Sequence, residues 1–268
     1  MSYKIIVLDI DGTLTNSKKE ISPATLEGLI DIQKRGYKVV LASGRPTPGI
    51  TPLAKQLKLA DYGSYILAYN GGLIIDCRTG ETIYQKTLPP DALPVLLTHA
   101  KEAGLGIVTY EENNVICGTE INEYMEIEAR IVNLPIKKVD NFCEYVDFPV
   151  NKCLMTGEPE QIANMEEKLK KVFNGYLNIF RSEPFFLEIM PPGIDKAHSL
   201  LKLLNSIGLT SKEMICCGDG YNDISMISIA GLGVAMENAR DCVKEAADYI
   251  TKSNDDDGVL YVINKFMK

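Results

Sequence analysis

The segment KIIVLDIDGTL, residues 4–14, joins a short apolar run to two aspartates and a glycine. An uninterrupted apolar run is typical of a strand that is buried on both faces of a parallel sheet. Side chains two positions apart in an extended chain point the same way, so we expect Asp9 and Asp11 to project together from the end of this strand. Open α/β sheets bind ligands at the carboxyl ends of their strands. The segment therefore predicts a parallel sheet with a functional site at that edge.

The rest of the chain repeats this alternation of short strands and helical patterns at both ends. It predicts an α/β fold with a Rossmann-like, parallel-sheet core domain. The middle has a different character, because the Pro/Gly clusters Leu88–Pro90 and Met190–Gly193 bracket a mixture of strands and helices. We therefore expect a discontinuous core domain formed by 1–82 and 190–268, with an inserted α+β cap domain at 83–189.

Composition excludes several classes of protein. The 268 residues have a formal net charge of −8, which argues against nucleic acid as a partner. No apolar run approaches the roughly 20 residues that a membrane span needs, and the N-terminus lacks a signal-peptide core. We expect a cytoplasmic protein with neither a membrane nor a nucleic-acid partner.

The cysteines and histidines limit the available chemistry. There are 7 cysteines, an odd number with no C-x-x-C pair, and 2 histidines. A disulfide scaffold, a zinc site and a histidine-based triad are all poor interpretations, and buried reduced thiols are expected instead. Catalysis must therefore depend on carboxylates, hydroxyls and lysine.

A second acidic turn follows another apolar strand in MICCGDGYND, residues 214–223. Its Asp219 and Asp223 lie in the same context as Asp9 and Asp11, at the end of a strand and before a helix. Carboxylates that share one edge of a sheet repel one another unless a cation lies between them. Hard oxygen ligands suit Mg²⁺, so we expect these four aspartates to form a magnesium site.

Two further features suit a phosphate group. The strand Val39–Ala42 ends in Ser43, Gly44 and Arg45, and a hydroxyl followed by free N–H groups can bind phosphate oxygens. Lys196 lies in the first turn of a predicted helix capped by Asp195, where its charge can neutralise a phosphoryl group. Two interpretations of Arg45 stay open, pairing with the phosphate or with a neighbouring carboxylate.

Other polar residues have simpler explanations. His198 is expected on a polar helix surface, and Asp255–Asp257 is expected to cap the last helix. A single D-x-D turn or helix lysine is also usually structural. Four such elements in this order, each at a strand end or a helix start, favour a catalytic site.

Together, the turns at 9–14, 43–45 and 218–223 and the lysine at 196 resemble the four motifs of the haloacid dehalogenase superfamily, in order along the whole chain. The insertion is similar to the type 2 cap of Cof-type sugar-phosphate phosphatases, as are Tyr69–Gly72 and Phe186–Ile189. One departure is Ala197, where this family often has glycine.

The resemblance implies a Mg²⁺-dependent phosphatase that acts on small phosphorylated metabolites, such as sugar phosphates. Asp9 would be the nucleophile and form an aspartyl-phosphate. Asp11 would be the general acid and base, a role that requires a raised pKa. Magnesium would be held by Asp9, the Asp11 backbone carbonyl and Asp219, with Asp223 in support.

The resemblance also implies a set of phosphate-binding residues: the Ile10 N–H, Ser43, the Gly44 N–H, Lys196 and Asn222. Two alternatives to the phosphatase stay open. One is a phosphosugar mutase of the same superfamily, which returns the phosphoryl group to its substrate. The other is a non-catalytic sensor that binds a phosphorylated ligand.

Overall fold

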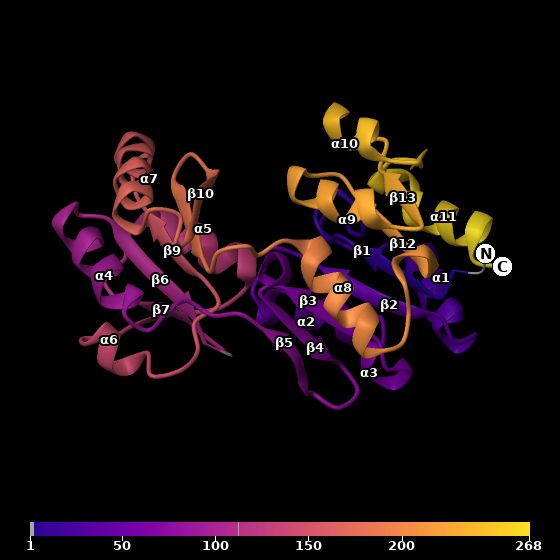
Figure 1. The fold of residues 1–268 in the computed structure, drawn as a ribbon, viewed down its shortest axis with the longest axis horizontal. Coiled ribbons are helices and arrows are strands. Elements are labelled where there is room, and N and C mark those ends of the chain that lie inside the picture. Colours follow the sequence, from indigo (N-terminus) through magenta and orange to yellow (C-terminus); the bar gives the residue numbers. More distant parts are fainter. Residues whose placement is uncertain (1–2, 112) are drawn as a thin grey trace. The chain divides into compact units, whose positions relative to one another are not determined.

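Strand β1 (Ile5–Leu8) is fully buried and lies inside an eight-stranded sheet. It pairs in parallel with β2 (Lys38–Ala42) on one side and with β12 (Met214–Gly218) on the other (Figure 1). The computed structural model describes residues 3–111 and 113–268. The sheet order is β14-β13-β12-β1-β2-β3-β4-β5, with the other strands at Tyr65–Ala68 (β3), Leu73–Asp76 (β4), Thr82–Gln85 (β5), Leu232–Ala235 (β13) and Tyr249–Ile250 (β14).

Two helices of this sheet begin at side-chain caps, and the second of these caps is the one that the sequence predicts. Ser22 accepts a hydrogen bond from the Thr25 N–H and precedes a proline, so α1 (Pro23–Lys34) begins there. Asp195 accepts from the His198 N–H at 2.7 Å and caps α8 (Lys196–Ser206), which makes Lys196 the first helical residue. The remaining helices are α2 (Thr47–Gln56), α3 (Leu59–Tyr62), α9 (Ile224–Ile229), α10 (Asp241–Ala246) and α11 (Gly258–Phe266).

One edge of the sheet departs from the purely parallel prediction. Strand β4 runs antiparallel to β3, because the chain reverses through the short 3-10 turn Tyr69–Gly71. Such an antiparallel edge is common on otherwise parallel sheets. The predicted fold class, a parallel-strand α/β core with a second mixed unit, is confirmed.

The chain divides into two compact units. The larger unit contains the eight-stranded sheet and is formed by the chain up to Arg45 together with residues 50–84 and 195–268. The smaller unit is formed by residues 46–49 and 85–194. The smaller unit, called the cap unit below, has a six-stranded sheet in the order β10-β11-β9-β6-β7-β8. Its elements are α4 (Ala92–Glu102), β6 (Gly106–Tyr110), β7 (Val115–Cys117), α5 (Glu123–Val132), β8 (Ile136–Lys138), α6 (Phe142–Tyr145), β9 (Cys153–Thr156), α7 (Pro159–Phe173), β10 (Asn178–Glu183) and β11 (Phe186–Met190).

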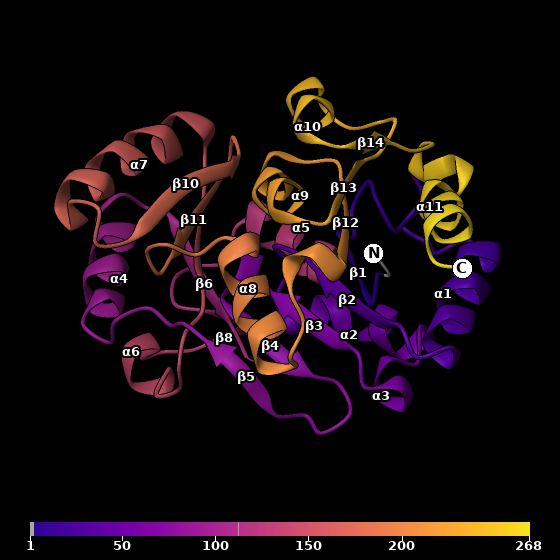
Figure 2. The same ribbon diagram turned by 45° about the vertical axis from the view of Figure 1, so that its right-hand side comes forward.

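The sheet of the cap unit has two different faces. Helices α4 and α7 cover one face (Figure 2), and their apolar side chains form a buried core with alternate residues of the strands, such as Ile107 and Met155. Glu188 of β11 has the opposite parity and pairs with the buried Lys152, which directly precedes β9; Lys152 Nζ lies 2.9 Å from Glu188 Oε2. The cap unit therefore buries charge within its own sheet.

Two features are absent from the described residues: a helix that could cross a membrane and a disulfide bond. Within residues 3–111 and 113–268, none of the helices has the length and apolarity to cross a bilayer. All seven cysteines have free thiols; four are buried, as expected, and Cys77, Cys143 and Cys242 are partly exposed.

Candidate active site

Lys196 is fully buried and is the centre of the site in the larger unit. Its ammonium donates to Asp9 Oδ1 at 2.6 Å, to Asp223 Oδ1 at 2.6 Å and to the Ala42 carbonyl at 2.8 Å. An ammonium has three N–H donors, so all of them are used. Burial alone would lower the pKa of Lys196, but the Asp223 and Asp9 carboxylates outweigh burial and raise it. The lysine is therefore a fixed positive charge.

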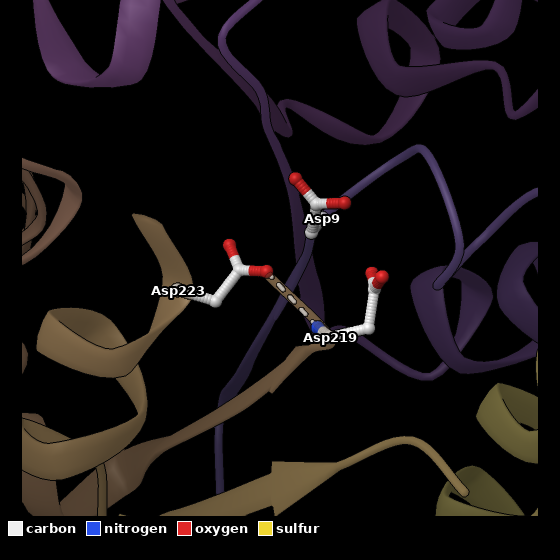
Figure 3. Close-up of side chains that lie close together, drawn as sticks. All are labelled: Asp9, Asp219 and Asp223. Carbon is white, nitrogen blue, oxygen red and sulfur yellow. Dashed lines mark hydrogen bonds between the residues drawn. The ribbon is translucent and has the colours of Figure 1, made fainter. Parts of the chain in front are cut away.

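The turn after β12 presents Asp219 and Asp223 toward the end of β1 (Figure 3). The second oxygen of Asp223 accepts from the Asp219 and Gly220 N–H groups at 3.0 and 2.9 Å, which fixes the turn. From the other loop, the Thr13 hydroxyl donates to Asp219 Oδ1 at 2.8 Å. Gly12 has φ +83°, and a Cβ there would overlap the Asp219 carboxylate. Only glycine lets the two loops approach this closely.

Asp9, Asp219 and Asp223 form a cluster with one carboxylate oxygen each, all within 4.8 Å of one another. Three carboxylates face one ammonium, which leaves two negative charges. Burial and the Asp223 and Asp219 carboxylates raise the pKa of Asp9, against the effect of Lys196. Burial also raises the pKa of Asp219, to about 6. An all-oxygen donor set with this charge fits a hard divalent cation such as Mg²⁺.

The side chain of Asp11 pairs with two basic residues rather than with Lys196. Arg45 binds both of its oxygens, with Nε and Nη2 each at 2.8 Å, and Lys19 Nζ contacts Oδ1 at 2.8 Å. Burial alone would raise the pKa of Asp11, but Arg45 and Lys19 outweigh burial and lower it. The acid role requires the opposite shift, so the described conformation holds Asp11 ionised. Of the two interpretations of Arg45, the structure shows pairing with a carboxylate.

The residues predicted to bind phosphate lie around the same edge. Ser43 is buried, and its hydroxyl accepts from the Arg45 N–H at 3.1 Å. Asn222 is exposed on the turn after β12, and its amide donates to Asn70 Oδ1 at 2.9 Å. Ile10 lies between the two aspartates of β1's loop with its side chain fully buried. Together with Gly44 and Lys196, these residues occupy loops after β1, β2 and β12 and the start of α8. Their roles stay predictions.

Sequence reasoning missed three residues of this region: Thr13, Lys19 and Asn70. Thr13 stood in the quoted motif, and Asn70 in a segment noted only for its resemblance, while nothing in the local pattern marked Lys19. His198 is exposed, as predicted.

Asp257 occupies the N-cap position of α11, as predicted, but its side chain makes no capping hydrogen bond to the helix. Asp257 accepts hydrogen bonds from the Ser22 and Thr25 hydroxyls, and Asp255 accepts from the N–H and hydroxyl of Ser17 at 2.8 and 2.6 Å. Their partners lie more than 200 residues earlier in the chain, where a local pattern cannot show them. The acids tie the C-terminal region to the segment that follows the Asp9–Asp11 loop.

Comparisons with known proteins agree with this architecture. Residues 6–263 match the family described as haloacid dehalogenase-like hydrolase. A haloacid dehalogenase-like hydrolase from Bacteroides thetaiotaomicron is 48% identical, with a TM-score of 0.96, covering 98% of this chain and 99% of that one. The subclass IIB sugar phosphatase BT4131 is 27% identical, with a TM-score of 0.81 over 98% of this chain and 99% of that one.

A curated relative has a named activity. The 5-amino-6-(5-phospho-D-ribitylamino)uracil phosphatase YcsE of Bacillus subtilis (strain 168) is 32% identical over 268 residues, covering 100% of this chain and 97% of its own length. The chain belongs to the haloacid dehalogenase-like hydrolases, which confirms the predicted family. It is a phosphoric monoester hydrolase, as predicted.

Proposed function

We propose that this hydrolase is a Mg²⁺-dependent phosphatase that cleaves small phosphorylated sugars through an aspartyl-phosphate on Asp9. The observation that carries the proposal is the Lys196 ammonium, which joins Asp9 to Asp223 at 2.6 Å each beside a cluster of three carboxylates. The names of BT4131, a sugar phosphatase, and YcsE, which acts on a phosphorylated ribityl compound, support the substrate class.

The metal requirement follows from the donor set. Asp9 and Asp219 would hold Mg²⁺ together with the Asp11 backbone carbonyl, and Asp223 would support them. Magnesium bound there would neutralise charge on the phosphate oxygens. When all three carboxylates of the cluster are ionised, the Lys196 ammonium leaves two negative charges uncompensated. A divalent cation would balance both of these charges, whereas a second lysine would balance only one.

Asp9 is the group that reacts with phosphorus. Lys196 holds Asp9 Oδ1, which favours the ionised carboxylate against burial and the neighbouring acids and orients it so that its other oxygen can attack. A bond forms between that oxygen and phosphorus, and the bond from phosphorus to the leaving alkoxide breaks. Water then attacks the aspartyl-phosphate and releases inorganic phosphate, which regenerates Asp9.

Asp11 moves the protons in both steps. It protonates the leaving alkoxide and afterwards takes a proton from the attacking water. Its present ion pairs with Arg45 and Lys19 oppose the first step, because they favour the ionised form. A substrate phosphate competes for the same guanidinium, since the guanidinium geometry matches both phosphate and carboxylate in a bidentate manner. We therefore expect Asp11 to become an acid once substrate takes over Arg45.

The cap domain predicted at 83–189 is proposed to select the leaving group. Lids of this kind exclude water and choose among substrates by the contacts that they add. The partner of the enzyme is then a small phosphorylated metabolite, whose phosphate is held by the larger unit.

Asp9→Asn is the decisive variant. It should lower turnover of sugar phosphates and of an aryl phosphate by at least about 10⁴-fold, because the amide cannot attack phosphorus. Phosphate release is measured with and without Mg²⁺, with circular dichroism as the control for folding. Substantial metal-dependent activity in Asp9→Asn would contradict the covalent route. An isomerised sugar phosphate without phosphate release would favour the mutase, and binding without turnover would favour the sensor.

A further inference from the structure

The turn after β3 adopts a backbone conformation that its sequence does not favour. Tyr69 and Asn70 both have φ +53°, and Gly71 has φ +103°, so three successive residues are left-handed. Glycine adopts this conformation freely and asparagine tolerates it, but a tyrosine there is a true outlier. Strain of this kind persists only where the surroundings impose it, and it is concentrated at functional sites.

Backbone contacts hold this turn against the loop that follows β2. The Asn70 N–H donates to the Ser43 carbonyl at 2.9 Å, and the Tyr69 N–H donates to the Arg45 carbonyl at 3.1 Å. These two bonds lie on either side of Gly44, and a Cβ on Gly44 would lie 3.1 Å from Asn70 Nδ2. The carboxamide of Asn70 therefore lies directly against the glycine that is proposed to bind phosphate.

The other side of the turn is fixed by the helix that carries Lys196. The buried Ser199 hydroxyl donates to the Gly71 carbonyl at 2.7 Å. A Cβ on Gly71 would lie 2.6 Å from the Asp195 carbonyl oxygen, so no larger residue fits. The left-handed turn therefore lies between the loop after β2 and helix α8, two of the segments that are proposed to bind phosphate, and is hydrogen-bonded to both.

The Asn70 side chain reaches a third such segment. Asn222 Nδ2 donates to Asn70 Oδ1 at 2.9 Å, although the two residues lie 152 positions apart. Asn222 is exposed on its turn. This bond uses one of its two amide N–H groups and restrains the orientation of the amide, and with it that of the second N–H. We propose that Asn70 is a positioning residue that orients the Asn222 amide for the substrate phosphate, an inference that rests on the proposed function.

The variant that separates the side chain from the backbone is Asn70→Gly. Glycine keeps the left-handed conformation and removes the acceptor for Asn222. In the presence of Mg²⁺, the dissociation constant of inorganic phosphate, measured by calorimetry, should rise about 5- to 10-fold, which is the effect of one lost hydrogen bond. The matched control is Asn133→Gly, which changes another left-handed asparagine, exposed in the cap unit, and should leave phosphate binding unchanged.

A double-mutant cycle tests whether Asn70 acts through Asn222. In an Asn222→Ala background, Asn70→Gly should change phosphate affinity less than twofold, because the group that it orients is gone. Multiplicative effects of the two changes, or a lower melting temperature of Asn70→Gly with unchanged phosphate affinity, would overturn the proposal. A wild-type protein that binds no phosphate and releases none from substrates would instead overturn the proposed function, and the role of Asn70 with it.

Discussion

The two units each bury a lysine with carboxylates, and the two lysines differ in almost every other respect. Lys196 of the larger unit follows a loop and bonds Asp9 and Asp223, which also come from turns after strands. Lys152 of the cap unit precedes β9 directly, and its partner Glu188 lies in the middle of β11. One lysine joins loops at a sheet edge, whereas the other ties neighbouring strands within a sheet.

The surroundings of the cap lysine account for its charge without a ligand. Lys152 Nζ lies 5.0 Å from the centre of the Tyr110 ring, and the Tyr110 hydroxyl donates to Glu128 Oε1 at 2.5 Å. Burial alone would lower the pKa of Lys152, but the Glu188 and Glu128 carboxylates outweigh burial and raise it. Burial of a charged side chain therefore does not by itself identify a functional site. What distinguishes the site around Lys196 is an excess of negative charge on glycine-rich turns at the ends of parallel strands.

The largest expected effect separates the two lysines by activity. Lys196→Met should lower phosphatase turnover by about 10³-fold or more, because it removes the cation that would face the phosphoryl group. The control is Lys202→Met on the same helix, whose side chain is exposed and should leave turnover within about twofold of wild type, as surface substitutions usually do. Initial rates with an aryl phosphate measure both. Equal losses of turnover in the two variants would contradict a specific role of Lys196 in the reaction.

The second expected effect distinguishes the two lysines by what each contributes to the stability of the protein. Lys152→Met should lower the free energy of unfolding by about 3 kcal/mol, because it leaves buried carboxylates without their cation. Adding Glu188→Leu should restore at least half of this loss, since an apolar pair can replace a buried ion pair. Urea denaturation measures both variants. A folded Lys152→Met protein that has lost turnover as fully as Lys196→Met would place the cap lysine in the active site and break the comparison.

The smallest expected effect concerns protons in the acidic cluster. With its pKa raised to about 6, the Asp219 carboxyl is protonated below that pH, and a bound cation must displace the proton. Mg²⁺ affinity measured by calorimetry should therefore fall by at least about tenfold per pH unit below pH 6, since the pKa of Asp9 is raised as well.

The same shift affects the metal-free protein. A carboxyl whose pKa is raised on folding contributes most to stability below its unfolded value and loses this contribution as the pH rises through 6. Added Mg²⁺ should therefore raise the melting temperature more at pH 7.5 than at pH 5. An equal rise at both values would contradict the raised pKa of Asp219.

The elements around the site were predictable where the signal is local. An apolar run followed by Asp9, or a helix cap followed by Lys196, is encoded within about ten residues, so both strand ends and the helix start lie where the sequence predicts. The contacts of Asp11 were not predictable in this way. Its partners Lys19 and Arg45 lie 8 and 34 positions away, and whether either reaches it depends on how the intervening loops fold.

Long-range pairings explain the remaining errors. The bond between Asn70 and Asn222 spans 152 positions, and a single sequence has no pattern that joins them. The reversal of β4 depends on a left-handed turn, although Tyr69 gives no sign of such a conformation. The ion pair of Lys152 is set by strand order in the cap unit, which propensity does not determine.

The bonds from Asp255 to Ser17 and from Asp257 to Ser22 have a consequence for how the protein is made. Ser17 and Ser22 emerge from the ribosome soon after Asp9, whereas their partners are synthesised more than 230 residues later. Strand β1 likewise waits for β12, its neighbour on one side. The turns around Asp9 therefore come together only after residues 214–218 and 255–257 have been synthesised, and a nascent chain that has exposed Asp9 still lacks most of the proposed site.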